Sequence, residues 1–138
     1  MKNNFNYYGL FFNIDVRDKI IDFVVNAMPG LDTTKAKLHC NHCTLLYKTQ
    51  YWNNRDLYNT LNVLCHDSNE YFITIDGIGW NDKALALRVK DVKNICANNT
   101  PHITILTFDN GKPFDSNKIT KWVDIKEPFV IKTYLKRV

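Results

Sequence analysis

The sequence contains two copies of a short motif, His-x-Thr, each inside a run of apolar and β-branched residues. The first copy is His42-Cys43-Thr44 and the second is His102-Ile103-Thr104. Side chains alternate between the two faces of a β-strand, so each copy predicts a strand with its His and Thr on one face and the middle residue on the other. Two such strands side by side would bring two imidazoles and two hydroxyls to one site. This requirement constrains the fold more than any other feature of the chain.

A pair of histidines with a pair of threonines suits the chemistry of a phosphodiester. One imidazole can take a proton from the attacking water or hydroxyl, and the other can give a proton to the leaving oxygen. The threonine hydroxyls can hold the non-bridging phosphate oxygens. We therefore predict that His42 and His102 are catalytic and that Thr44 and Thr104 bind phosphate. The sequence leaves open which histidine is the acid, and the alternative for either one alone is a hydrogen-bonded core histidine.

At these residues the chain resembles a known superfamily. His42-Cys-Thr-Leu and Pro101-His-Ile-Thr-Ile resemble the paired H-x-[ST]-φ motifs of the 2H phosphoesterases. The segment from Pro101 to Asn117 is further similar to the second motif region of the cyclic phosphodiesterase domain of tRNA ligases. The resemblance implies an α+β fold: a single two-lobed domain, with antiparallel sheets around a central cleft and a few flanking helices. It also implies metal-independent cleavage of RNA-type bonds, without a cofactor.

The resemblance implies several substrates that share a ribose hydroxyl next to the reacting phosphate. These are a 2′,3′-cyclic phosphate, a 2′-5′ oligoadenylate and a cyclic dinucleotide such as cGAMP. The small size and the absence of a Gly-rich P-loop favour a free-standing enzyme for small nucleotides or short oligonucleotides over a tRNA-splicing component. Because several viral members of the superfamily destroy immune second messengers, one hypothesis is viral evasion of nucleotide-based immune signalling, by analogy.

Two alternatives to this function are an RNA-repair cyclic phosphodiesterase and a non-catalytic RNA- or nucleotide-binding module. Paired imidazoles favour an enzyme, because a pure binder of nucleic acid needs cationic contacts more. The formal charge of +4 suits an anionic ligand without the dense Lys and Arg clusters of a duplex-binding protein. Protein partners are not predicted.

The composition predicts one domain over residues 1–138, because 138 residues that are 45% hydrophobic can bury one core. No apolar run approaches the ~20 residues that span a bilayer, and the N-terminus lacks the apolar core of a signal peptide. We therefore expect no membrane association and a cytoplasmic location, in the host cytoplasm if the protein is viral.

The run from His39 to Cys43 contains a Cys-x-x-Cys pattern that could indicate a metal or redox site. A structural zinc site needs four ligands, and the remaining Cys and His residues are scattered over other predicted elements. A redox pair would open a helix, whereas Thr44 to Tyr47 continues a strand. Strict alternation puts Cys40, His42 and Thr44 on one face and His39 and Cys43 on the other. We predict reduced thiols and no metal site, with a zinc-dependent protein as a third hypothesis.

Hydrophobic periodicity and capping residues predict the remaining elements. Gly77, Gly79 and the turn Asn81-Asp82 predict a hairpin with a bulge, and residues 50–54 and 91–100 read as connections. The predicted strands are 7–14, 42–47, 71–75, 84–89, 102–108 and 128–137, and the predicted helices run from the N-cap Asp15 to 28, from Asn54 to His66, and from Asp115 to Trp122.

Residues outside the two motifs are further candidates for substrate binding. Tyr8 and Trp80 could stack on a base; the alternative for each is packing in the core or at a strand edge, which is the more common role of aromatic residues at the position of Tyr8. Lys132, Tyr134 and Lys136 share one face of the last strand and form a basic and aromatic stripe that could line the phosphate site. The alternative for this stripe is a solvent-facing edge protected by lysine.

Overall fold

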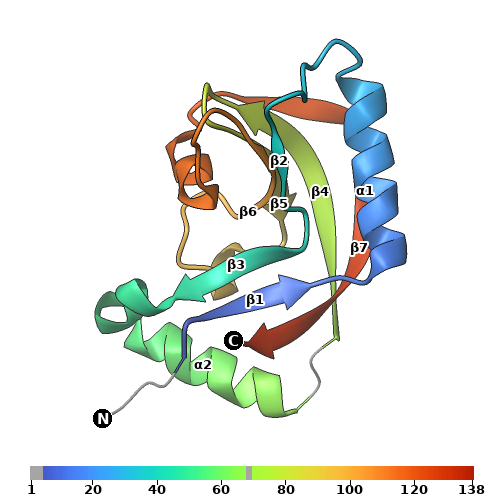
Figure 1. The fold of residues 1–138 in the computed structure, drawn as a ribbon. Helices are drawn as coiled ribbons and strands as arrows, with labels where there is room; N and C mark the ends of the chain where they lie inside the picture. Colours follow the sequence, from blue (N-terminus) through green and yellow to red (C-terminus); the bar gives the residue numbers. More distant parts are fainter. Residues whose placement is uncertain (1–4, 68–69) are drawn as a thin grey trace.

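The computed structural model describes residues 5–67 and 70–138, and within them the chain forms seven β-strands, two α-helices and three short 3₁₀ segments (Figure 1). The strands are β1 (Tyr7–Phe11), β2 (Lys37–Leu38), β3 (His42–Tyr47), β4 (Glu70–Trp80), β5 (Ala84–Lys90), β6 (His102–Thr107) and β7 (Trp122–Arg137). The helices are α1 (Ile14–Ala27) and α2 (Arg55–His66), and the 3₁₀ segments are η1 (Lys48–Asn53), η2 (Lys93–Ile95) and η3 (Pro113–Lys118).

All strands belong to one antiparallel sheet in the order β2-β6-β3-β1-β7-β4-β5. An additional pairing between β5, at one end of this order, and β6, the neighbour of the other end strand, closes the sheet on itself. The α+β class is therefore confirmed. The separate sheets that we expected are instead one continuous sheet, and the two lobes and the central cleft stay predictions.

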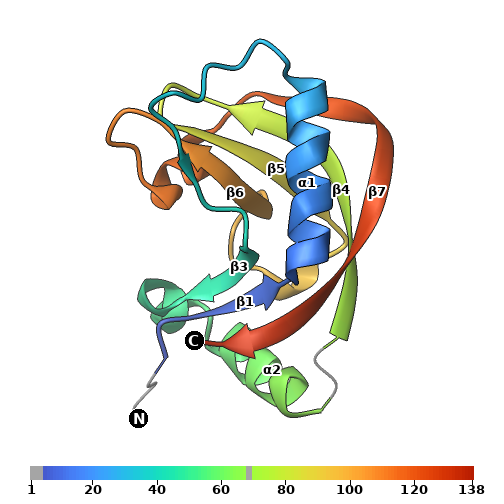
Figure 2. The same ribbon diagram turned by 45° about the vertical axis from the view of Figure 1, so that its right-hand side comes forward.

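Both helices cover the same face of the sheet, which we call the core face. Leu10 on β1 is paired with Cys43 on β3 and Leu135 on β7, and all three side chains are fully buried. The α2 residue Cys65 contacts the carbonyl oxygen of Leu135 through its thiol, at 3.8 Å. Figure 2 shows α1 beside β4 and β7, where the ring centroids of Phe23 and Phe129 lie 5.0 Å apart. The opposite face carries no α-helix within the described residues.

The first helix begins one residue after Asn13, not at Asp15 as predicted. The Asn13 side-chain oxygen accepts a hydrogen bond from the backbone N–H of Val16 at 3.0 Å, which satisfies one of the unpaired donors of the first turn. Asp15 lies inside that first turn, where its charge favours the positive end of the helix. Because Asn13 caps the helix, the preceding strand ends at Phe11, earlier than predicted. The second helix matches the prediction, with Asn54 at its N-cap.

The predicted bulged hairpin of β4 and β5 is confirmed by a register shift between Ile75 and Gly77. The Asn81 side-chain oxygen accepts from the backbone N–H groups of Lys83 and Ala84 and closes the turn. The predicted helix from Asp115 to Trp122 is wrong. A 3₁₀ segment ends at Lys118 and Trp122 begins β7, because the backbone of residues 122–124 pairs with β4.

The connections also contain short regular structure. Residues 50–54, predicted as a loop, lie mostly in η1, and Trp52 is exposed there. The connection at 91–100 contains one turn of 3₁₀ helix, η2. Neither α-helix of the described residues has the length and the apolar character needed to cross a bilayer.

Candidate active site

The two His-x-Thr strands are neighbours in the sheet. Cys43 on β3 pairs with Ile103 on β6 in antiparallel register, and both side chains are fully buried on the core face. The same register, continued by one residue in each direction, sets His42 opposite Thr104 and Thr44 opposite His102. The structure therefore brings the four predicted residues together on the face opposite the core, which we call the histidine face. In Figure 1, η3, drawn in orange, lies at the left of the sheet and α1 at its right.

The His42 ring lies among aromatic side chains of β1. The ring centroids of Tyr7 and Phe11 are 5.0 Å and 4.9 Å from that of His42, and each pair is nearly parallel. Gly9, between those two residues on the same face, leaves the room that the imidazole occupies, since an added Cβ would lie 3.3 Å from His42 Cδ2. Aromatic, Gly and aromatic at a spacing of two is a signal that the sequence carried and our prediction did not use.

Burial keeps His42 neutral. Loss of solvation, followed by the neighbouring positive charges of His102 and His39, lowers the pKa of His42 to about 4. Its Nδ1 contacts the side-chain oxygen of Asn41, and its Nε2 lies 3.0 Å from the Thr44 hydroxyl. Because an amide oxygen only accepts, Nδ1 carries the proton and Nε2 presents a lone pair.

His102 is held in the same tautomer by a different group. Its Nδ1 donates to the carbonyl oxygen of Thr100 at 2.8 Å, which leaves Nε2 for the site. Burial lowers the pKa of His102, while the Thr100 carbonyl acts in the opposite direction because it stabilises the protonated ring. Both motifs therefore present Nε2 of a histidine whose other nitrogen is fixed, which is the arrangement that proton transfer requires.

The threonine hydroxyls have unlike partners. Thr104 Oγ1 lies 2.9 Å from the hydroxyl oxygen of Ser116, which is buried where η3 folds over β5 and β6. Thr44 instead contacts His42 within its own motif. Ser116 was not predicted, and no pattern in the sequence links it to Thr104.

Arg88 lies next to His102 on the histidine face, where the two are directly paired between β5 and β6. Its guanidinium donates to Asp76 at 2.8 Å and to Asp124 at 2.5 Å, and these hydrogen bonds raise the pKa of Arg88. The positive charge beside His102 is therefore compensated by two carboxylates.

Tyr8 is buried, contrary to the prediction that it could stack on a base. Its side chain is fully inaccessible on the core face, packed against Phe5 and Tyr58, and its hydroxyl donates to Asn62 at 3.1 Å. Strand alternation places its neighbour Tyr7 on the histidine face instead. There the Tyr7 ring is stacked on that of Tyr47, with centroids 6.2 Å apart.

Trp80 lies on the wrong face for the predicted role, and another tryptophan lies beside the motifs. Trp80 borders a hollow with Met28, Leu31 and Val123 on the side of α1. Trp122 is paired with Gly79 between β4 and β7, on the histidine face, and its ring centroid is 6.4 Å from that of His102. An added Cβ at Gly79 would come within 2.5 Å of the Trp122 ring, so glycine is needed beneath it.

His39 lies on the histidine face, opposite to the prediction. Strict alternation fails because Cys40, between β2 and β3, has a left-handed backbone with φ 42°. His39 Nε2 is 3.0 Å from the hydroxyl of Thr107, which shares a face with Thr104 because both pair with alternate residues of β5. Cys40 is buried, not on the histidine face as predicted.

Tyr134 and Lys132 lie on one face of β7, and the predicted stripe requires this arrangement. Tyr134 is paired with Phe11, which is paired with His42, so the three residues form one row across β7, β1 and β3. Lys132 forms a salt bridge with Glu70 at 3.2 Å.

No group of three His, Cys, Asp or Glu side chains within the described residues is arranged to hold a metal ion. The four cysteines are free thiols, and burial raises the pKa of Cys40 and of Cys96 to about 11. Protonated thiols are poor metal ligands and poor nucleophiles.

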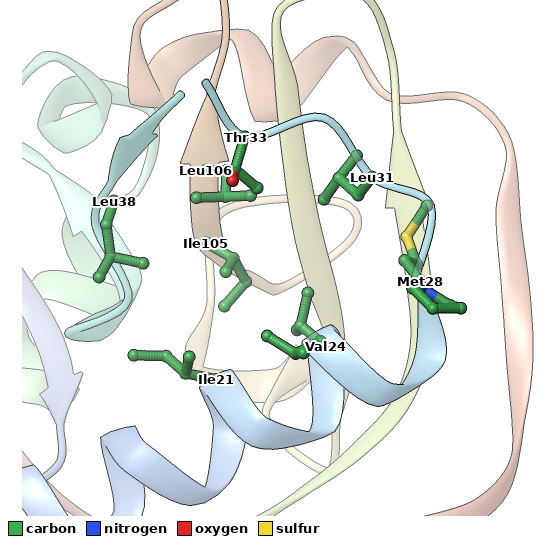
Figure 3. A pocket seen from close by; sticks show the side chains of 10 residues that line it. Ile21, Val24, Met28, Leu31, Thr33, Leu38, Ile105 and Leu106 are labelled. Atoms are coloured by element: carbon green, nitrogen blue, oxygen red, sulfur yellow. The ribbon is translucent and has the colours of Figure 1, made fainter. Parts of the chain in front are cut away.

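An apolar pocket lies on the core face behind the second motif (Figure 3). Ile105 and Leu106 of β6 face Ile21 and Val24 of α1 across it, and Thr33 is the one polar side chain among the residues that line it. This lining offers no acid, base or nucleophile.

Comparison with known proteins shows a family and a similar fold. The family model of the fungal tRNA ligase phosphodiesterase domain matches residues 31–130. The fold is similar to that in a crystal structure of a fungal RNA kinase, with a TM-score of 0.68 and 15% sequence identity. The match covers 98% of this chain and 45% of that one, so the chain spans less than half the length of the RNA kinase. Among curated proteins, no sequence matches this chain.

Proposed function

We propose that this chain, which belongs to the family of the fungal tRNA ligase phosphodiesterase domain, is a phosphodiesterase that cleaves RNA-type bonds by two-histidine acid–base catalysis. The observation that carries the proposal is the pairing of Cys43 with Ile103, because this register sets both His-x-Thr motifs on one face. The substrate that the family match best supports is a 2′,3′-cyclic phosphate at an RNA end. Cleavage of that bond is a hydrolase reaction.

The hydrogen bonds support separate roles for the two histidines. His42 is the base: its neutral Nε2 takes a proton from the attacking water as the new P–O bond forms. His102 is the acid: its protonated Nε2 gives a proton to the ribose oxygen as the bond from phosphorus to that oxygen breaks. The product is a phosphate monoester. The Thr104 hydroxyl, positioned by Ser116, donates to a non-bridging oxygen and stabilises the charge that develops there.

Cyclic dinucleotides such as cGAMP and 2′-5′ oligoadenylate contain the same class of bond. The proposed chemistry applies to them as well, provided that a ribose hydroxyl or a water reaches the phosphorus in line. A role in viral evasion of immune signalling rests on the sequence resemblance. The substrate panel therefore includes these nucleotides beside the cyclic phosphates.

The test is turnover by the purified protein in the presence of a chelator. The panel contains nucleoside 2′,3′-cyclic phosphates, an oligonucleotide with a 2′,3′-cyclic phosphate end, 2′-5′ oligoadenylate, and 2′-5′- and 3′-5′-linked cyclic dinucleotides. His42→Ala and His102→Ala should each lower kcat by about 10²-fold or more. His66→Ala is the matched control, because His66 lies at the exposed end of α2 and bonds the carbonyl oxygen of Asn62.

Cleavage that survives in both catalytic-histidine variants would exclude the mechanism. Binding of a panel member without turnover, unchanged in those variants, would favour a nucleotide-binding module. Loss of activity with chelator, restored by zinc, would favour a zinc enzyme.

A further inference from the structure

A continuous strip of the histidine face extends from His42 across two neighbouring strands. His42 pairs with Phe11 and Phe11 pairs with Tyr134, while Gly9 pairs with Lys136. Directly paired residues of antiparallel strands project on the same face. Phe11, Tyr134 and Lys136 therefore lie on the same side of the sheet as the first motif, and we call these three residues the strip.

The aromatic part of the strip is continuous with the imidazole ring of His42. The Phe11 ring stacks on His42 at 4.9 Å with an interplanar angle of 23°. Tyr134 is partly exposed in the next strand, about 4.8 Å further along the sheet. Flat aromatic side chains beside a phosphate site are the usual support for a nucleoside, since every base has a π-face and stacks without sequence preference.

The charged part of the strip is Lys136. Its ammonium lies 5.6 Å from the centroid of the Phe11 ring. The Lys136 side chain is exposed and lies on the same face of the sheet as His42. No carboxylate in residues 5–67 and 70–138 forms a salt bridge with it. Lys132, two residues earlier on the same face, is instead paired with Glu70 at 3.2 Å. The uncompensated charge of the strip is therefore at Lys136.

The position of Lys136 limits what it can bind. Its backbone lies two strands from that of the first motif, roughly 10 Å away at the usual strand spacing, and the second motif lies one strand beyond the first. A phosphate between the two motifs is therefore farther from Lys136 than a phosphate over β1. The cross-strand neighbour of Lys136, Gly9, has no side chain, and the rings of His42 and Phe11 lie over that position instead. A second phosphate, one nucleotide away from the first, would meet the ammonium.

We propose that the strip binds the nucleotide that carries the reacting phosphate, with Lys136 on the phosphate at its 5′ side. The inference rests on the proposed function and narrows the substrate class. A cyclic phosphate at the end of an oligonucleotide occupies both the motifs and the strip, whereas a mononucleotide cyclic phosphate leaves Lys136 without a partner. The enzyme then discriminates by a backbone phosphate, not by base identity.

The experiment compares two substrates that react identically. One is adenosine 2′,3′-cyclic phosphate, and the other is a diadenosine nucleotide that ends in the same cyclic phosphate. We expect kcat/KM to favour the dinucleotide by about tenfold or more at low salt, the range of one hydrogen bond to a charged group, and the preference to shrink as salt rises. Lys136→Gln should remove most of the preference by lowering kcat/KM for the dinucleotide only.

Lys126→Gln is the matched control, because it removes the charge of an exposed lysine on the same strand, ten residues before Lys136. This variant should keep the ratio of kcat/KM for the two substrates near that of the parent protein. Both lysines are exposed, and an unchanged thermal midpoint would exclude loss of folding as a cause.

The outcomes separate this inference from the proposed function. If the protein cleaves both substrates with equal kcat/KM and His42→Ala abolishes this cleavage, the binding role of the strip is wrong and the proposed function stands. An equal effect of Lys136→Gln on both substrates, or an effect of Lys126→Gln on the preference equal to that of Lys136→Gln, would also overturn that binding role. If the intact protein cleaves neither substrate, both the binding role of the strip and the proposed function are wrong.

Discussion

The hydroxyl oxygen of Ser116 lies 2.9 Å from Oγ1 of Thr104, and Ser116 is 1% exposed. This contact ties η3 to the second motif and positions the Thr104 hydroxyl. Thr44, the equivalent residue of the first motif, contacts His42 instead. Two motifs with the same residue pattern are therefore held by different partners, and their threonines should differ in importance.

Ser116→Ala should lower kcat by about tenfold with little change in KM, because a misoriented hydroxyl loses an interaction made in the transition state. In a Thr104→Val background the same change should have no further effect, since the hydroxyl that Ser116 positions is already absent. Steady-state kinetics of the two single variants and the double variant measure this coupling. Asn117→Ala, an exposed neighbour on η3, is the control, and full additivity of the two changes would contradict the positioning role.

Trp122 and Trp80 should respond differently to truncation. Trp122→Leu should lower kcat/KM and raise the pKa of His102, because the ring beside His102 contributes to its burial. Trp80→Leu should leave both unchanged, since that side chain lies on the side of α1. NMR titration of the His102 ring and initial rates provide the two readouts. Equal effects of both substitutions would contradict the prediction, because they would show that the position of a tryptophan on one or the other face of the sheet does not decide its effect on His102 and on activity.

The pH dependence of kcat/KM should be bell-shaped, with its maximum on the acid side of the ordinary histidine pKa of about 6.5. The base His42 has its pKa lowered to about 4, so activity should fall as the pH drops through that value. The acid His102 must be protonated, and because burial lowers its pKa the alkaline limb should lie below about 6.5. The corresponding profile of kcat should move to higher pH, since bound phosphate favours protonated imidazole. A maximum of kcat/KM above neutral pH would argue against this assignment of roles.

The same histidines should make the fold sensitive to acid. The folded protein holds His42 neutral down to a pKa of about 4, whereas the unfolded chain protonates it near 6.5. The unfolded state therefore binds more protons between these values, and the free energy of unfolding should fall as the pH drops, by up to about 1.4 kcal/mol for each unit of pKa difference. Denaturant titrations at pH 7 and pH 4.5 measure the loss. His42→Gln should reduce it, and a variant with the same acid sensitivity as the parent would refute the explanation.

Patterns within single segments predicted the elements well where neighbouring residues decide them. The apolar period of α2 and its cap Asn54, and the glycines and turn residues of the β4–β5 hairpin, act over a few residues and need no tertiary information. The N-cap of the first helix is Asn13, two residues before the predicted Asp15, because the Asn13 side chain accepts the hydrogen bond from Val16 N–H. The membership of the 2H-type family was likewise visible in two motifs of three residues.

That each His-x-Thr motif lies in a strand with its middle residue buried could be predicted without the fold, because alternation is a property of one extended segment. Tertiary structure decided which other side chains share that face. Cys40 with its positive φ reset the alternation and brought His39 to the site, and the pairing of Trp122 with the distant Gly79 chose one tryptophan over the other. Strand register joins residues far apart in sequence, and a shift of one residue exchanges the two faces. For that reason the histidines and threonines could be named from the sequence, whereas Tyr7, Trp122 and Ser116 required the fold.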